Sequence, residues 1–293
     1  MKLSTSEYGP HLKHGVSEGS LEYHHYASGH PISDWNAQQY DDFAEQRQQA
    51  ARDLIAAIPT LPNANDRLKI TDLGCGSGLS TSLLVERWRD AEVKGIDQSP
   101  DMLAQASKRV PHALFEQGDV ANFKATIPQD LILANASLHW LPDHRKLFPH
   151  LAQQLVSGGT LAVQMPNTLP EPSHQLMSEL AHKPAFAEHL SNLNSDREDL
   201  LTPTDYYDVL ASVCEGIKLW ETRYHHILDG PQEILRWFAT TGLKPYLEML
   251  PKQKRPDFEK QYIDAIERHY PSTRDGKVLL RLPRFFIIAR RRA

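Results

Sequence analysis

Three glycines stand at alternate positions directly after a short apolar run of the sequence. The run covers residues 68–73, and Gly74, Gly76 and Gly78 follow it before a segment with helical spacing. Glycines at a strand-to-helix turn allow a tight bend and let backbone N–H groups approach a ligand closely. The Gly-x-Gly-x-Gly spacing differs from the dinucleotide-binding fingerprint and lacks the Gly-Lys-Ser/Thr ending of a P-loop. By itself the loop therefore indicates either a ligand-binding turn or a structural one.

Two acidic residues favour the ligand-binding interpretation. Asp97 ends the next apolar run, and a carboxylate at that position can accept hydrogen bonds from both hydroxyls of a ribose. Asp119 follows a third run, from which a side chain can accept the amino hydrogens of adenine while an adjacent backbone N–H donates. Together with the glycine loop, the two acids predict a site for an adenosine-containing cofactor, and Asp97 alone equally suits a nicotinamide cofactor.

Apolar runs typical of strands alternate with helical periodicity between residues 36 and 165. A helix is expected at 36–58, followed by strands at 68–73, 93–97, 114–115, 131–134 and 160–165, with helices between them at 80–88, 99–110 and 143–156. This alternation predicts an α/β, Rossmann-like, doubly wound and mostly parallel sheet. The loop and the two acids then lie at the carboxyl ends of the strands, where such sheets bind ligands.

The alternation ends after Pro166. Residues 167–212 and 231–269 have helical patterns, whereas 216–227 and 284–289 are typical of strands. We expect the helical segments to form a lid inserted after the fifth strand, over the carboxyl-terminal edge of the sheet. The predicted organisation is an unstructured extension at 1–33, a cofactor-binding core at 34–166, a helical lid and substrate region at 167–280, and a final strand with a basic C terminus at 281–293.

The sequence predicts no metal centre. Residues 1–33 are rich in His, Gly, Ser and Tyr, which is typical either of a metal-binding tract or, as we favour, of an unstructured extension. Cys75 and Cys214 are too few for a disulfide framework and lack metal-ligand spacing. His225 and His226 are adjacent in a predicted strand and therefore face opposite sides.

Composition limits the kinds of partner. The chain has 293 residues, of which 40% are hydrophobic and 24% are charged, as in ordinary globular proteins. Its net charge of −5 provides no basic field for nucleic acid or anionic membranes. The apolar stretch at 285–289 is far shorter than the roughly 20 residues of a transmembrane helix, and nothing near Met1 has the apolar region of a signal peptide. We expect a cytoplasmic protein without nucleic-acid or membrane partners.

The motifs carry a resemblance to a known family. Residues 72–78, 95–97 and 118–120 resemble the three cofactor motifs of class I S-adenosylmethionine-dependent methyltransferases. Further segments resemble the trans-aconitate 2-methyltransferase family within that class; they are 33–36 with Tyr40, 134–144, 164–166, 206–208, 241–245 and 283–284. The resemblance extends from Ser33 to the C terminus. It implies the methyltransferase fold, S-adenosylmethionine as cofactor and S-adenosylhomocysteine as product.

The resemblance also implies which residues bind the cofactor. They are Trp35, Tyr40, Asp72, Gly74, Gly76, Asp97, Gln98, Asp119, Val120 and Asn135. The glycine backbone approaches the methionine part, Asp97 holds the ribose, and Asp119 with Val120 binds the adenine. Trp35 and Tyr40 close over the sulfonium, because its positive charge is attracted to aromatic faces.

A trans-aconitate substrate has three carboxylates, and those that do not react must be held by cationic or hydrogen-bonding side chains. The implied substrate-binding residues are His139, Tyr206, Tyr207, Arg223, Trp237, Lys244 and Arg284, with His225 and His226 as further donors. Lys244 and Arg284 lie in segments that match the family. His139 departs from the family's glutamine, and if it contacts the substrate, it is where the acceptor can differ.

We expect no catalytic general base. A carboxylate with an ordinary pKa near 4 is already ionised at pH 7, so methyl transfer requires alignment rather than deprotonation. Positioning of this kind can lower the barrier by roughly 7–11 kcal/mol. Asn135 flanks the transferring methyl group, and we expect it to position the reactants together with His139 and Tyr206.

Three alternative functions stay open at this point. A methyltransferase for another small carboxylic acid, or for malonyl-carrier protein, would share the motifs; the acidic carrier would dock on the basic residues Arg281, Arg284, Arg290, Arg291 and Arg292. A nicotinamide dehydrogenase would share the fold, although 118–120 and the three-glycine spacing speak against it. A non-catalytic protein that senses S-adenosylmethionine would bind the cofactor without turnover.

Overall fold

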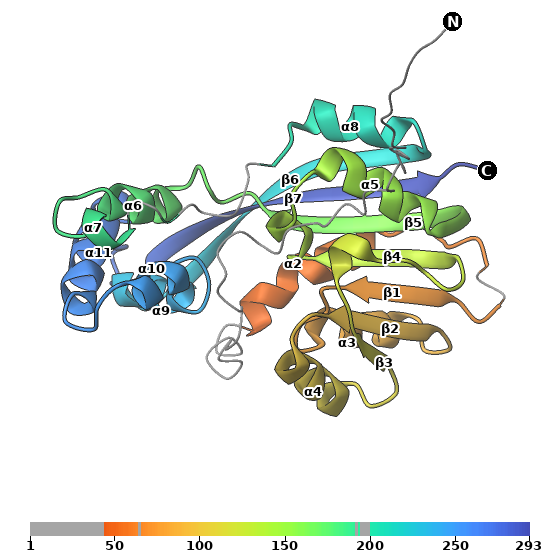
Figure 1. The fold of residues 1–293 in the computed structure, drawn as a ribbon, viewed down its shortest axis with the longest axis horizontal. Helices are drawn as coiled ribbons and strands as arrows, with labels where there is room; N and C mark the ends of the chain where they lie inside the picture. Colours follow the sequence, from red (N-terminus) through yellow and green to blue (C-terminus); the bar gives the residue numbers. More distant parts are fainter. Residues whose placement is uncertain (1–43, 64–65, 191–192, 194–199) are drawn as a thin grey trace, which may run out of the picture. The chain divides into compact units, whose positions relative to one another are not determined.

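Seven strands form one sheet in the order β3-β2-β1-β4-β5-β7-β6 (Figure 1). The computed structural model describes residues 44–63, 66–190, 193 and 200–293, all within the unit Pro31–Ala293. The predicted extension at 1–33, together with Trp35 and Tyr40, lies outside the described residues. The first five strands pair in parallel, whereas β7 is antiparallel to both of its neighbours. The predicted doubly wound, mostly parallel sheet is confirmed.

The core elements lie close to their predicted positions. The strands are β1 (Lys69–Leu73), β2 (Glu92–Asp97), β3 (Leu114–Gln117), β4 (Gln129–Asn135), β5 (Leu155–Pro166), β6 (Cys214–Leu228) and β7 (Val278–Arg291). The helices beside them are α2 (Ala44–Ala57), α3 (Leu79–Arg87), α4 (Pro100–Arg109), α5 (His144–Gln153) and α8 (Pro203–Ala211), with 3-10 turns η1 (Val120–Asn122) and η2 (Leu138–Trp140). Ser99 caps α4, because its Oγ accepts from the Met102 backbone N–H at 3.3 Å.

Two layers of helices cover the sheet. Buried side chains of α2 and α3 share a hydrophobic core with Ile70, Leu133, Ala162 and Phe286 of the sheet. Because strand residues alternate between faces, these four define the face that α2 and α3 cover. On the opposite face, α5 and α8 pack together, with Phe148 of α5 and Tyr206 of α8 in ring contact at 5.0 Å.

The predicted end of the helix at 143–156 is wrong. Helix α5 ends at Gln153, and β5 begins at Leu155, so the glycines at 158–159 lie inside the strand. Leu155 already pairs with Gln129 of β4, and the register then shifts before the next pair. The extra residues form an irregularity in which Gly158 takes φ +75°. β7 is likewise longer than predicted, because it pairs with β6 along most of its length.

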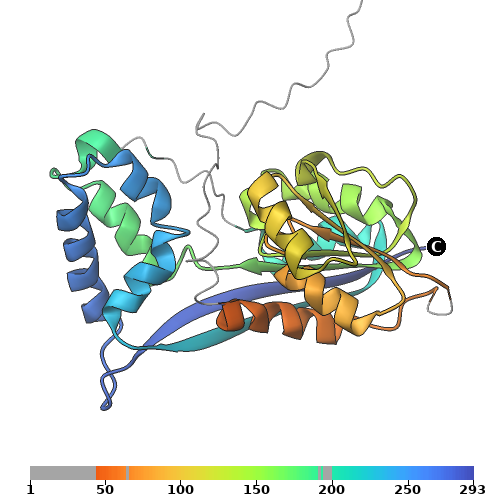
Figure 2. The same ribbon diagram turned by 90° about the horizontal axis from the view of Figure 1, so that it is seen from below.

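The remaining helices form a second hydrophobic core. They are α6 (Pro172–Ala181), α7 (Ala187–Leu190), α9 (Pro231–Ala239), α10 (Lys244–Met249) and α11 (Arg255–His269). Figure 2 shows these helices gathered at one end of the two long strands β6 and β7. Their buried side chains pack with Leu228 at the end of β6 and with Val278 and Leu280 at the start of β7. The helical insertion therefore has two parts, one after β5 and one between β6 and β7. α8 does not belong to it, because α8 packs on the sheet. The function of the insertion as a lid stays a prediction.

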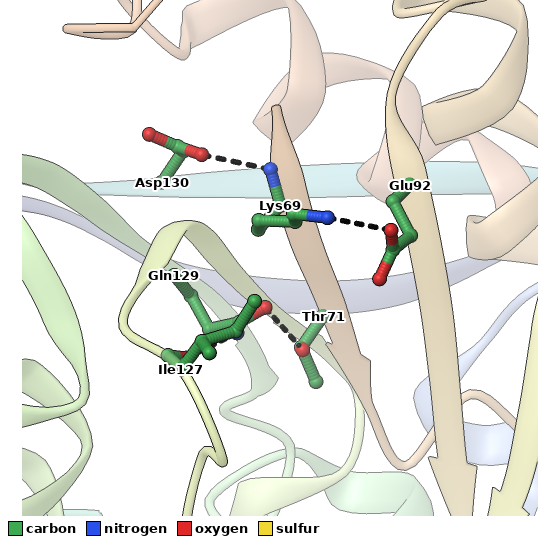
Figure 3. Close-up of polar contacts among 6 residues, drawn as sticks. All are labelled: Lys69, Thr71, Glu92, Ile127, Gln129 and Asp130. Carbon is green, nitrogen blue, oxygen red and sulfur yellow. Dashed lines mark hydrogen bonds and ion pairs between the residues drawn. The ribbon is translucent and has the colours of Figure 1, made fainter. Parts of the chain in front are cut away.

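Polar contacts hold β1 and β4 together at the end of β4 that lies away from the glycine loop (Figure 3). The buried Thr71 hydroxyl donates to Gln129 Oε1 at 2.8 Å, and Gln129 Nε2 donates to the Ile127 carbonyl at 2.6 Å. Nearby, the half-exposed Lys69 and Glu92 form an ion pair at 2.6 Å. None of the helices in the described ranges has the length and hydrophobicity of a membrane-spanning segment.

Replacing Gln129 with methionine tests this network. Methionine is similar in size but has no amide group to form these hydrogen bonds. We expect Gln129→Met to lower the free energy of unfolding by about 1–3 kcal/mol, because the Thr71 hydroxyl is left buried without its acceptor. The measurement is urea unfolding. Glu92→Gln is the control and should cost less than about 1 kcal/mol, since its ion pair is partly exposed. Equal losses in the two variants would contradict this account.

Candidate active site

The glycines of the loop serve different purposes. Gly74 and Gly76 have φ +70° and +52°, a backbone region that favours glycine. A Cβ on Gly74 would lie 2.3 Å from the Cβ of Ser137, so this glycine is required by the close approach of the segment after β4. A Cβ on Gly76 would have no atom within 4 Å. Gly76 therefore borders open space, where a ligand can approach its backbone.

Asp97 joins the glycine loop to α4. Its Oδ2 accepts the Gly76 backbone N–H at 2.9 Å, and its Oδ1 accepts the Ser99 backbone N–H at 2.9 Å. The side chain is half-buried, and each oxygen has a further lone pair to offer. The glycine loop thus holds Asp97, the residue that is predicted to bind the ribose, in place. Gln98, the next residue, is exposed.

Asp119 caps the short turn η1. Its Oδ1 accepts the Ala121 backbone N–H at 2.9 Å, and its Oδ2 accepts Asn122 Nδ2 at 2.7 Å. Asp119 is exposed and Val120 is buried beneath it. The structure therefore shows that the Asp119 side chain stabilises η1, directly after the carboxyl end of β3.

Asp72 is fully buried beneath the glycine loop. Its Oδ2 accepts the hydroxyls of Ser80 at 2.7 Å and Thr81 at 2.6 Å, in the first turn of α3. Its Oδ1 has no hydrogen-bond partner among the described residues. Burial raises the pKa of this carboxyl to about 6, against the opposing effect of the two hydroxyls. Asp72 is consequently a buried acceptor with one oxygen available to a donor on a ligand.

The turn after β4 is held between two neighbouring strands. Ala136 has φ +53°, which is uncommon for a residue with a side chain, and its N–H donates to the Gln164 carbonyl at 2.9 Å. The Ser137 hydroxyl donates to the Leu73 carbonyl at 2.7 Å. Asn135, which begins the turn, has a buried Oδ1 for which the described part of the chain provides no hydrogen-bond partner. The turn thus fixes Asn135 beside the glycine loop.

Polar side chains of four strands share the sheet face that α2 and α3 cover. Each lies two residues along its strand from a residue of the hydrophobic core on that face, so alternation places it on the same side. These residues are Asp72 of β1, Asn135 of β4, Gln164 of β5 and Arg284 of β7. All four stand at the same edge of the sheet, because β1, β4 and β5 end there and β7 runs antiparallel to β5.

Arg284 is accompanied by aromatic and histidine side chains. On β6, Tyr224 and His226 share its face, and His226 stacks on Trp237 of α9 with ring centroids 5.0 Å apart. Burial, and then the nearby charge of Arg284, lower the pKa of His226 to about 4. The Tyr224 hydroxyl donates to Asp53 Oδ2 of α2 at 2.5 Å. The structure therefore brings Arg284 and Trp237, both predicted, together around His226.

Other predicted substrate residues are not on this face. Arg223 is exposed on the opposite side of β6, because neighbouring strand residues alternate. Tyr207 is 52% exposed on α8. Lys244, at the start of α10, pairs with Glu248 at 3.6 Å. Arg223 and Tyr207 are therefore not brought together with Arg284, and their predicted contact with a substrate stays a prediction.

Tyr206 is inside the core rather than at a binding surface. Its ring stacks on Phe285 at 5.4 Å, and its hydroxyl lies 2.6 Å from Nδ1 of His144. Nε2 of His144 donates to the Leu138 carbonyl at 2.9 Å, since a carbonyl can only accept. Tyr206 therefore contacts η2, which contains the buried His139, through His144. His144 is the last residue of the 134–144 segment that resembles the family, and the sequence interpretation gave it no role of its own.

Comparisons with known proteins agree with this geometry. A family model described as a methyltransferase domain matches residues 70–159. The chain is 44% identical over 260 residues to the trans-aconitate 2-methyltransferase of Afipia carboxidovorans, covering 89% of this chain and 100% of that protein. It is 42% identical over 259 residues to the Yersinia pestis protein of the same name, covering 88% and 98%. The chain belongs to the trans-aconitate 2-methyltransferase family.

A solved structure agrees on the fold. The YcgJ protein from Bacillus subtilis superposes with a TM-score of 0.52 at 16% identity, over 84% of this chain and 99% of that one. Membership in the trans-aconitate 2-methyltransferase family makes this chain a methyltransferase, as the sequence motifs predicted. The family's cofactor motifs coincide with the loop, Asp97 and Asp119, at the carboxyl ends of β1, β2 and β3.

The buried carboxyl of Asp72 generates a pH prediction. Its pKa is about 6 in the fold and 3.8 ordinarily, so the folded state binds the proton more tightly than the unfolded chain. The stabilisation is complete below pH 3.8 and is lost as the pH rises through 6, a change of roughly 3 kcal/mol. Asp72→Asn should remove this component from the free energy of unfolding measured between pH 4 and 7. If the free energy of unfolding changed with pH in the same way in the variant and the wild type, the contribution of Asp72 would be ruled out.

Proposed function

We propose that this chain transfers the methyl group of S-adenosylmethionine to a carboxylate of trans-aconitate, giving the monomethyl ester and S-adenosylhomocysteine. The observation that carries the proposal is the position of Arg284 on the same sheet face as Asp72 and Asn135, in a member of the trans-aconitate 2-methyltransferase family. Arg284 can bind an anionic acceptor, and the motif residues can bind a methyl donor. Both lie at the same edge of the sheet.

The residues of the motif region fit this cofactor. Oδ1 of Asp72 is a buried acceptor without a partner, which suits the ammonium group of the methionine part. Gly76 borders open space, and Asp97 has lone pairs for the ribose hydroxyls. Asp119 and Val120 would take the adenine. When bound, the cofactor supplies an electrophilic methyl group on a sulfonium. Trp35 and Tyr40 stay proposed contacts to it.

The substrate end requires positive charge, because trans-aconitate is a trianion at pH 7. His226 has a pKa of about 4 and is neutral at that pH, so it provides a hydrogen bond but no charge. The guanidinium of Arg284 is charged at every physiological pH and matches a carboxylate in two-point geometry. We assign to Arg284 the binding of a carboxylate that does not react.

The protein's own contribution to the reaction is alignment. The acceptor oxygen is already ionised, so no group has to remove a proton. The turn at Asn135 is fixed against β1 and β5, and His144 with Tyr206 fixes η2 and thus His139. These contacts hold the surroundings of the methyl group before the substrate arrives, which supports catalysis by positioning.

A malonyl-carrier protein is a poorer acceptor for this structure. The arginines that are close in sequence separate along β7, where a distance of ten strand residues spans about 33 Å. At one end, Arg281 pairs with Glu171 at 3.5 Å; at the other, Arg291 donates to the Gln153 carbonyl at 3.0 Å. They do not form a single basic patch for docking an acidic partner.

The proposed activity is tested with S-adenosylmethionine labelled in its methyl group. We expect transfer to trans-aconitate, with one methyl ester in the product by mass spectrometry, and much less transfer to citrate or malonyl-carrier protein. Transfer to malonyl-carrier protein alone would contradict the proposed acceptor. Cofactor binding without transfer to any of the three would favour a protein that senses the cofactor.

Arg284→Gln tests the proposed carboxylate contact. A hydrogen bond to a charged group contributes about 1.5–3 kcal/mol, so kcat/KM for trans-aconitate should fall about 10- to 150-fold. Arg223→Gln is the matched control, since Arg223 lies two strands' width from β5 on the opposite face and should leave kcat/KM within about twofold. Equal losses would indicate a general effect of charge instead.

His139→Ala tests the absence of a general base. We expect kcat to fall by no more than about 10²-fold, since the side chain orients the acceptor and does not take a proton. A loss above about 10⁴-fold, the upper range for removal of a general base, would show that His139 transfers a proton. Steady-state kinetics at saturating cofactor provide the measurement.

A further inference from the structure

Gln164 has no counterpart among the sequence-predicted site residues, yet it stands at the centre of the polar row. It is 1% exposed, and its Nε2 has no hydrogen-bond partner among the residues that the structure describes. Its strand neighbours in register are Asn135 on β4 and Phe286 on β7. Asn135 is half-buried, and its buried Oδ1 likewise has no partner within the described part of the chain. Two adjacent amide side chains thus leave a buried donor and a buried acceptor unsatisfied at the end of the sheet.

Unsatisfied buried amides are uncommon because each lost hydrogen bond destabilises the fold. Gln129, on the same pair of strands, shows the ordinary arrangement: its amide nitrogen and oxygen both have partners. Both residues are glutamines, so the difference in their hydrogen bonding comes from their positions in the sheet. At the carboxyl edge, next to the turn that flanks the proposed methyl group, the missing partner is expected to come from a ligand.

The neighbours of Gln164 indicate which ligand group this is. Gln164 pairs in register with Asn135. It lies two residues before Pro166, which pairs with Arg284 at the end of the strand. Diagonal neighbours on a sheet are about 7–8 Å apart, a distance that a flexible arginine and an acid with several carboxylates bridge readily. An acceptor held at its outer end by Arg284 would therefore present a second carboxylate to Gln164 and Asn135.

The charge change of the reaction decides which carboxylate each residue should hold. The acceptor oxygen donates an electron pair to the methyl carbon while the carbon–sulfur bond breaks and its electron pair stays on sulfur. The carboxylate loses its negative charge as the ester forms, and the sulfonium becomes a neutral thioether. A cation on the reacting carboxylate would stabilise the ground state more than the transition state and slow the transfer. A neutral amide N–H orients that carboxylate with a smaller penalty.

We infer that Gln164 Nε2 binds the reacting carboxylate of the acceptor, while Arg284 holds a carboxylate that does not react. The inference rests on the proposed function and adds the residue that selects and orients the acceptor oxygen. Gln164 is a substrate-binding residue in this account, and it provides no proton to the reaction.

Gln164→Met tests the inference, because methionine keeps the approximate length of the side chain and removes the N–H donor. We expect kcat/KM for trans-aconitate to fall about 10- to 100-fold, as for a lost hydrogen bond to a charged group. Affinity for S-adenosylhomocysteine by calorimetry should stay within about twofold. The urea midpoint of the apoprotein should not fall, since the amide N–H has no partner to lose.

Gln129→Met is the matched control, with the same substitution in a fully bonded glutamine. It should lower the urea midpoint and leave kcat/KM of the folded enzyme within about threefold. Gln164→Glu provides a second variant: its added negative charge should reduce kcat/KM more than methionine does. A Gln164→Met enzyme with unchanged kcat/KM, or with S-adenosylhomocysteine affinity reduced tenfold, would overturn the assignment to the acceptor.

The wild-type enzyme separates this inference from the proposed function. If it methylates trans-aconitate and Gln164→Met does so equally well, the assignment of Gln164 is wrong and the proposed function stands. If the wild type binds S-adenosylhomocysteine but methylates no trans-aconitate, the proposed function is wrong and the assignment that rests on it is withdrawn as well.

Discussion

Where β1 and β4 end side by side, the missing side chain of Gly74 leaves room for the Cβ of Ser137, which would otherwise lie 2.3 Å from a Cβ at that position. Ser137 donates to Leu73 at the end of β1, and Ala136 donates to Gln164 of β5 from a left-handed backbone conformation. This close approach fixes the turn after β4 against the glycine loop. In the proposed function, the glycine loop binds the methyl donor and the turn after β4 lies beside the acceptor. The close approach of these two elements therefore sets the spacing between donor and acceptor.

The polar groups around this contact are arranged at a cost to the stability of the fold. Within the described ranges, Asp72 keeps one buried oxygen without a donor, and Asn135 and Gln164 each keep a buried amide atom without a partner. An unsatisfied buried group costs about 1–3 kcal/mol in a folded protein. Such costs concentrate at functional sites, where a ligand later supplies the missing partners. We therefore propose that these unsatisfied groups are the ones that a ligand contacts.

Part of this architecture could be predicted from the sequence, for identifiable reasons. The glycine loop and Asp97 follow apolar runs in an alternating strand and helix pattern, and a parallel sheet brings such residues to one edge. The orientation of Tyr206 and Arg223 could not be predicted in the same way. Tyr206 lies on the inner face of a helix whose packing partner, α5, is distant in sequence, and Arg223 lies in a strand that alternates between two partly polar faces. Gln164 was hidden within a continuous buried run of β5, where periodicity gives no signal.

The account assigns the acceptor to the sheet face that α2 and α3 cover, with its reacting carboxylate beside Gln164 and another beside Arg284. The most direct test is a crystal structure of the protein with S-adenosylhomocysteine and trans-aconitate. We predict a carboxylate oxygen about 2.7–3.2 Å from Gln164 Nε2 and a second carboxylate in contact with the Arg284 guanidinium. An acceptor bound on the Arg223 side of β6, or one that leaves Gln164 without a ligand contact, would contradict the account.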